Sequence, residues 1–176
     1  SQKEFKNKVK LDIEKQFINQ SDQKFFNDCV ELLITNTKIE LPEHFVKKLI
    51  IANQKEKVNE NDIEKEFSQS TKGIKYQLIE SKLIEENNID ISSDAVKDYA
   101  KEMVKKQMAM YGQNKVDDEE LNSIVERVTS NQDELKRIYS MLLNEKILNV
   151  FKNKMTKKES KVDYKKFIET AYDKNV

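Results

Sequence analysis

The sequence predicts an all-α protein, and three observations carry that prediction. The chain of 176 residues contains two glycines and one proline, whereas β-sheet proteins need turn residues at short intervals. Apolar residues recur every three or four positions along most of the chain, as they do on one side of an amphipathic helix. Apolar residues make up 37% of the chain and charged residues 36%, a balance that suits long helices with much exposed surface.

The N-terminal region is predicted to be helical over about residues 3–36. The polar stretch at 20–22 leaves open whether this region forms one long helix or two. Its apolar stripe begins with residues that are four positions apart: Phe5, Val9, Ile13 and Phe17.

A second helix is predicted to begin at Pro42, since proline is favoured in the first turn of a helix. Glu43 adds a carboxylate near the positive end of the helix dipole, and the helix ends near Asn53. A third helix is predicted over about residues 59–86. Gly73 interrupts it, and we interpret this glycine as a kink or a close helix crossing.

The second half of the chain carries clear start and stop signals for two further helices. Ser92 or Ser93 caps the first, and Gly112 is well placed to end it. Asp117, followed three residues later by Glu120, is an aspartate version of a capping box and starts the second.

Two more helices complete the predicted set of about seven. The longer one begins at Ser130 or Asn131 and runs to about Met155. A connector leads to a short final helix that Asp163 caps.

Few residue patterns in this chain suggest enzymatic chemistry. Two isolated glycines cannot build a phosphate-binding loop, and one cysteine with one histidine cannot supply a zinc site. Cys29 lies in an apolar stretch, where a cysteine usually acts as a small buried hydrophobic residue. The sequence therefore predicts no catalytic residue, no metal site, no cofactor and no enzyme.

The charges are balanced, with 32 basic and 32 acidic residues mixed along the chain. This balance gives no electrostatic footprint for direct binding of nucleic acid or an anionic membrane. No apolar run approaches the roughly 20 residues that span a bilayer. We expect neither nucleic acid nor membrane as a partner.

The methionines form a group with two open interpretations. Met103, Met108 and Met110 follow one another closely and lie beside Tyr111. They could fill the core as ordinary apolar residues. Because methionine is flexible and polarisable, they could instead contact varied protein partners.

The order and spacing of four stretches resemble the C-terminal domain of trigger factor, a ribosome-associated chaperone family. The first is the entry "IELPEHF", and the second resembles the helix–break–helix arm of that family. The third is a loop between arm helices, and the fourth resembles the closing long helix with its terminal segment. The four stretches are Ile39–Phe45, Tyr76–Met103, Tyr111–Leu121 and Leu135–Phe167.

This resemblance implies an elongated multi-helix domain with protruding helical arms, like that of SurA. We expect a single domain over residues 1–176, with a body at 1–58 and 130–176 and arms at 59–129. The implied function is ATP-independent binding of unfolded or nascent polypeptides through exposed apolar patches in a helical cradle. The candidate client-binding residues are Phe45, Leu49, Met103, Met108, Met110 and Tyr111.

The resemblance also implies a cytoplasmic location and leaves room for a weak homodimer. Trigger factors contact the ribosome through an N-terminal domain and carry a glycine-rich peptidyl-prolyl isomerase module. Neither is seen in this sequence, so the chain is expected to correspond to the segment downstream of the isomerase module. Two alternatives stay open: a periplasmic SurA-like chaperone domain, and a helical scaffolding module with one fixed protein partner.

Overall fold

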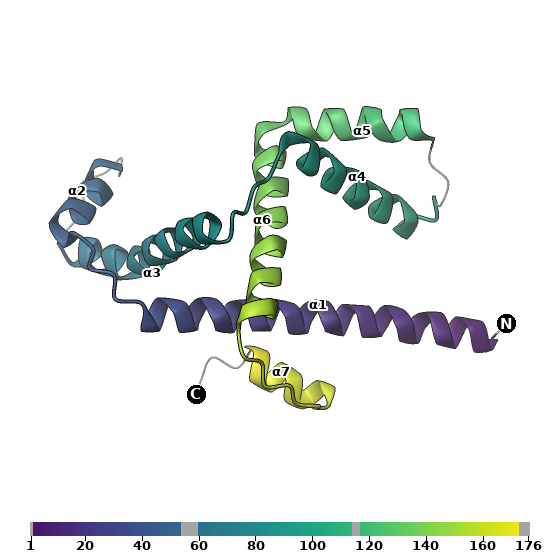
Figure 1. Ribbon diagram of the computed structural model, residues 1–176, viewed down its shortest axis with the longest axis horizontal. Coiled ribbons are helices and arrows are strands. Elements are labelled where there is room, and N and C mark those ends of the chain that lie inside the picture. The colour runs from purple at the N-terminus through teal and green to yellow at the C-terminus, as the bar shows by residue number, and fades with distance from the viewer. Residues whose placement is uncertain (1, 54–59, 114–116, 173–176) are drawn as a thin grey trace. The chain divides into compact units, whose positions relative to one another are not determined.

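The computed structural model describes residues 2–53, 60–113 and 117–172, which form seven α-helices and no strand (Figure 1). The all-α prediction is confirmed. The helices are α1 (Gln2–Asn36), α2 (Glu43–Asn53), α3 (Glu60–Glu86), α4 (Ser93–Met110), α5 (Asp118–Ser130), α6 (Gln132–Lys154) and α7 (Tyr164–Tyr172).

The first two helices decide one open question and show that the prediction of Pro42 in the first turn of the second helix is wrong. α1 is a single helix that runs through the polar stretch at 20–22, because none of those residues breaks the backbone hydrogen bonds of a helix. Pro42 lies directly before α2 and not in its first turn. Its carbonyl accepts the first hydrogen bonds of that helix, from the backbone N–H of Phe45 at 2.9 Å and of Val46 at 3.0 Å.

Three of the predicted N-terminal caps are made by short polar side chains. Each accepts a hydrogen bond from the backbone N–H three residues later: Ser92 Oγ at 3.2 Å, Asn131 Oδ1 at 3.1 Å and Asp163 Oδ1 at 2.8 Å. The predicted capping box at Asp117 is wrong. Asp117 has the extended backbone of a cap, but its side chain accepts no capping hydrogen bond and lies exposed to water.

The two glycines have different roles. Gly112 has a φ of +81° and ends α4 as predicted, because a left-handed residue lets the next N–H, of Gln113, bond to the Met108 carbonyl at 3.0 Å. Gly73 lies inside α3, and no described atom lies within 4 Å of the position that a Cβ would take there. The prediction of a close helix crossing at Gly73 is therefore wrong.

The helices form two compact units. Unit 1 comprises Ser1–Lys82 and Met155–Val176, and unit 2 comprises Leu83–Lys154. The division into a body at 1–58 and 130–176 with arms at 59–129 stays a prediction.

Unit 1 contains α1, α2, α7 and most of α3, joined by a small number of specific contacts. α1 is linked to α3 by the ion pair between Glu31 and Lys72, at 2.7 Å. α7 contacts α1 through the rings of Tyr164 and Phe17, whose centroids are 5.6 Å apart.

Unit 2 is built around a core that α4, α5 and α6 share. In Figure 1, the first turn of α4 and the last turn of α5 lie beside the first turns of α6. The buried core residues are Val96 and Ala100 from α4, Val125 from α5, and Ile138 and Leu142 from α6. The side chains of this core come from three helices, so none of the three can be removed without exposing the others.

We expect opposite effects from replacing each glycine by alanine. Gly73→Ala should stabilise the chain by about 1 kcal/mol, because alanine favours a helix interior and meets no described neighbour. Gly112→Ala should destabilise it by about 1–2 kcal/mol, because alanine is strained at positive φ. Thermal melts followed by circular dichroism should then show midpoints shifted by about 2–4 °C per kcal/mol in opposite directions. A lower midpoint for Gly73→Ala would contradict an open position on α3.

Candidate functional site

Phe45 and Leu49 form an exposed apolar pair on α2, which we call the α2 patch. They are four residues apart, so their side chains are neighbours on the helix surface. Their exposed fractions are 63% and 49%. Val46 and Ile50 on the other side of the same helix are buried. α2 therefore holds one apolar pair in the protein interior and presents a second to solvent.

Lys47 fixes α2 against α3 and so determines which pair faces outward. Its Nζ pairs with Glu43 at 2.6 Å and with Glu64 of α3, and it lies 5.2 Å from the ring centroid of Phe67. The hydrogen bond that Lys47 donates to Glu43, followed by the one that it donates to Glu64, raises the pKa of Lys47. The ammonium is thus held in its charged form between two helices, and rotation of α2 would break these contacts.

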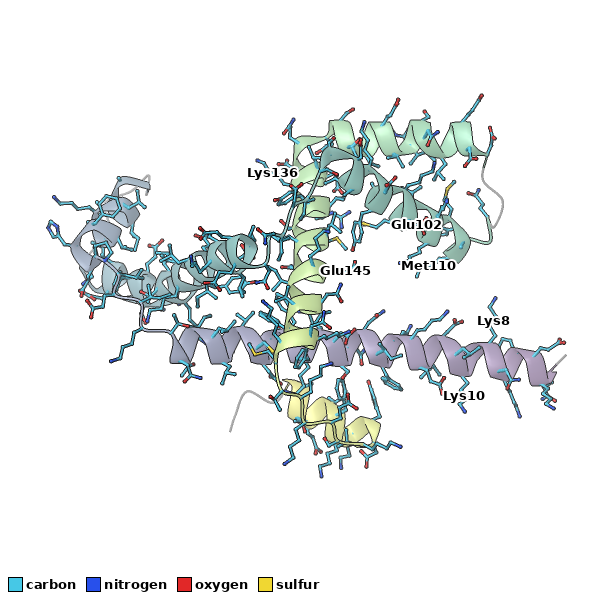
Figure 2. All side chains as sticks on the ribbon, viewed as in Figure 1. Lys8, Lys10, Glu102, Met110, Lys136 and Glu145 are labelled. Atoms are coloured by element: carbon cyan, nitrogen blue, oxygen red, sulfur yellow. The ribbon has the colours of Figure 1, made fainter. Side chains whose placement is uncertain are left out.

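Met110 and Tyr111 form a second exposed pair, at the end of α4, which we call the α4 tip. Their exposed fractions are 87% and 79%, among the highest of the large apolar side chains in the described residues. Figure 2 shows Met110 near the last turn of α4. Because Gly112 ends the helix directly afterwards, this pair lies at a chain reversal and not on a packed helix side.

The remaining methionines of α4 are less accessible than the α4 tip. Met103 packs against the core of unit 2, and Met108 is half-buried. For Met103 the structure thus favours the interpretation as an ordinary core residue. The six candidate client-binding residues divide into a pair in unit 1 and a group in unit 2.

A polar contact holds the middle of α4 against α6. Tyr99 lies beside the core of unit 2, and Glu145 of α6, labelled in Figure 2, accepts a hydrogen bond from its hydroxyl. Burial, followed by the charge of Glu145, raises the pKa of Tyr99. The neutral phenol is the form that fits this position.

The described residues contain no group of three or more His, Cys, Asp or Glu side chains that could hold a metal ion. Cys29 is buried as predicted. Burial and the neighbouring Asp28 carboxylate raise the pKa of its thiol. A raised pKa keeps a thiol protonated and unreactive, so the position suits packing.

The prediction from sequence missed the exposure of the first half of α1. Phe5, Val9 and Ile13 have the spacing of a core stripe, yet all three are exposed. The one signal in the sequence is the density of lysines around them, at positions 3, 6, 8 and 10. Such a density leaves only a narrow apolar stripe.

Comparison with known families identifies a match for this chain. The family described as Probable trigger factor, C-terminal domain, matches residues 21–170. The chain belongs to this family. This match confirms the resemblance drawn from the four sequence stretches. The trigger factor C-terminal domain is a chaperone-type domain. No curated protein and no solved structure matches the chain.

The trigger factor match includes the α2 patch and the α4 tip and leaves out residues 1–20 and 171–176. Among the described helices of this trigger factor domain, none is both long and apolar enough to cross a membrane.

We expect the raised pKa of Tyr99 to appear as a loss of stability at alkaline pH. Below pH 10.0, the ordinary value, the phenol is neutral in both states and its contribution is constant. Above that value the unfolded chain ionises first, because the folded state raises the pKa of the phenol, and the free energy of unfolding falls. Urea unfolding between pH 8 and pH 11 measures this decline.

The free energy of unfolding of Tyr99→Phe should decline less steeply with pH than that of the parent, because phenylalanine has no proton to lose. Tyr111→Phe, on the exposed α4 tip, is the matched control and should follow the parent. If the free energy of unfolding falls with pH equally steeply in Tyr99→Phe and in the parent, Tyr99 does not cause the decline.

Proposed function

We propose that this chain is an ATP-independent chaperone domain that binds unfolded or nascent polypeptides through the α2 patch and the α4 tip. The observation that carries this proposal is the pairing of exposed apolar side chains with a fixed support. Phe45 and Leu49 are exposed while Val46 and Ile50 anchor the same helix. A rigid support matters because exposed side chains that packed into the protein interior could no longer bind a client.

The size of each surface supports weak and reversible binding. Fully burying one large apolar side chain contributes about 1.5–3 kcal/mol, and the members of the α2 patch are only partly exposed. Covering the pair thus gives about 2–4 kcal/mol, which corresponds to millimolar affinity or weaker. A client must contact several surfaces at once to be retained, and it is released when these weak contacts open together.

The distribution of exposed apolar residues favours a chaperone over a scaffolding module with one fixed partner. Exposed large apolar side chains occur on α1, α2, α3 and at the end of α4, including Leu32, Ile51 and Leu78 in addition to the two pairs. A single fixed partner requires one contiguous patch, whereas varied unfolded segments can use separate ones. Charged residues between them keep such a surface soluble.

The remaining parts of this proposal rest on the family. The chain acts in the cytoplasm and catalyses no reaction itself. In trigger factors, ribosome contact and prolyl isomerisation belong to other domains than this one.

The purified chain is expected to suppress aggregation of an unfolded client. Light scattering of a chemically denatured client, diluted into buffer, should fall as the chain is added in equimolar amount and in excess. Because each contact is weak, suppression should be stronger in excess than at equimolar amount, and it should be independent of ATP. Unchanged scattering at a tenfold excess would contradict the proposal.

Two double variants test the two surfaces separately. Phe45→Gln with Leu49→Gln, and Met110→Gln with Tyr111→Gln, should each weaken binding of an unfolded client peptide by at least about tenfold, since each removes most of the roughly 2–4 kcal/mol that covering an apolar pair contributes. Glutamine is a good helix former, so helical circular dichroism should be unchanged. Fluorescence anisotropy of a labelled peptide gives the affinity.

Ile51→Gln is the matched control for the α2 patch. Ile51 lies on the same helix and is 50% exposed, but it is turned away from Phe45 by more than a quarter of a helix turn. It should leave the affinity nearly unchanged. An equal loss in the control and in the α2 double variant would show that general surface apolarity, and not the α2 patch, binds the client.

A further inference from the structure

The first half of α1 presents a row of apolar side chains to solvent, which we call the α1 stripe. It consists of Phe5, Val9, Ile13 and Phe17, and each member follows the last by four residues. Successive members are rotated by only about 40° around the helix axis, so they form one connected row about 18 Å long. Every side chain from Gln2 to Asn19 is exposed, so the row is open along its length.

α7 shows what kind of element packs against one end of the α1 stripe. The ring of Tyr164, the first residue of α7, lies with its centroid 5.6 Å from that of Phe17. Phe167 and Ile168 follow Tyr164 by three and four residues, so the three side chains share one side of α7, and the later two are half-buried. A helix with one apolar side therefore contacts the stripe at Phe17, and the rest of the stripe continues from this contact as an open surface.

The length of the α1 stripe separates it from the α2 patch and the α4 tip. Each of those surfaces is a pair of side chains, which can contact one or two client residues whatever the conformation of the client. Four side chains in a row of about 18 Å are covered only by a client that keeps its own apolar residues in a row of similar length. The α1 stripe can thus select for the conformation of what it binds.

The backbone of α1 decides which conformation suits such a row. Inside a helix the backbone N–H and C=O groups are bonded within the helix, so α1 offers no hydrogen-bond partner to the backbone of an extended client. An extended segment laid over the stripe would have backbone groups that are shielded from water and unpaired, which is unfavourable. A helical segment satisfies its own backbone and brings a ridge of side chains that packs between those of α1.

The charges beside the α1 stripe carry both signs. Lys10 and Glu14, which are 3.8 Å apart, lie along one side of it, and Lys8 and Asp12 lie along the other. Figure 2 shows Lys8 and Lys10 on opposite sides of α1. Because each flank has a basic and an acidic residue, the flanks favour neither a strongly basic nor a strongly acidic partner. The apolar side of the partner is what the stripe recognises.

We infer that the α1 stripe binds an amphipathic helical segment of a client, in the way that α7 contacts it at Phe17. The client helix lies along α1 from Phe5 to Phe17 and extends the apolar contact that Tyr164 makes there. Its apolar residues recur every three or four positions over about twelve residues. This inference rests on the proposed function and names the class of segment that one surface of the domain selects.

Two labelled peptides of about 16 residues, with the same composition and no net charge, test the inference on the full chain. In the helical peptide the apolar residues recur every three or four positions, and in the alternating peptide every second position. Fluorescence anisotropy should show at least about fivefold tighter binding of the helical peptide, because only that peptide can cover the whole stripe. Proline at the centre of the helical peptide prevents a continuous helix and should abolish this preference.

Matched variants of α1 locate the binding site. Ile13→Gln should weaken binding of the helical peptide by about fivefold, because it removes an apolar residue from the middle of the stripe. Leu11→Gln is the control: Leu11 is also exposed but lies on the opposite side of α1, and its replacement should change the affinity by less than about twofold. Both positions are exposed and glutamine is a good helix former, so neither variant should lose helical circular dichroism.

The α2 double variant, Phe45→Gln with Leu49→Gln, separates this inference from the proposed function. It should weaken both peptides alike, because a pair of side chains sets no client conformation. Equal affinity of the parent for the two peptides, or equal effects of Ile13→Gln and Leu11→Gln, would overturn the inference and leave the proposed function standing. A parent that binds neither peptide would overturn both. Sedimentation equilibrium identifies a second copy as the occupant: a dimer that Ile13→Gln dissociates and the helical peptide does not displace would also overturn the inference.

Discussion

The small side chain of Ala100 lets α4 pack closely against α5 and α6, and unit 2 depends on that contact. Val96, Val125, Ile138 and Leu142 meet around it. A larger residue at position 100 would separate the helices, since protein cores have no spare volume. Because α4 is held by its middle, its last turn can project beyond the core, which is why Met110 and Tyr111 remain exposed. The accessible end of α4 is thus a consequence of where its apolar stripe stops.

In unit 1, contacts between helices also determine which side chains stay exposed, and these contacts include an ion pair as well as apolar packing. α2 has two apolar pairs, and burial of Val46 and Ile50 leaves Phe45 and Leu49 outside. Lys47 joins the buried side to Glu64 of α3, so the ion pair and the apolar contact favour the same rotation of α2. Ion pairs of this exposure contribute little free energy by themselves. Their value here is orientation, because only one rotation of the helix satisfies both kinds of contact.

The positions of the helices could be predicted from the sequence because their signals are local. Ser92, Gly112 and Asp163 act through bonds to residues three or four positions away. The exposed surfaces could not be predicted, because they depend on contacts between helices. Phe5 and Val9 have the spacing of buried residues, and the lysines around them are the one local sign that other helices leave them uncovered. In the same way, α2 offers two apolar pairs, and only the contact with α3 selects the buried one.

The exposed surfaces differ in kind, and that difference separates their roles. The α2 patch and the α4 tip are pairs without a matching order of charges, so they can accept many sequences weakly. The stripe on α1 is longer, and its four members, Phe5, Val9, Ile13 and Phe17, are exposed along one side of the first half of the helix. Separate apolar surfaces of different lengths suit unfolded segments of different lengths, and the charged residues between them keep the domain in solution.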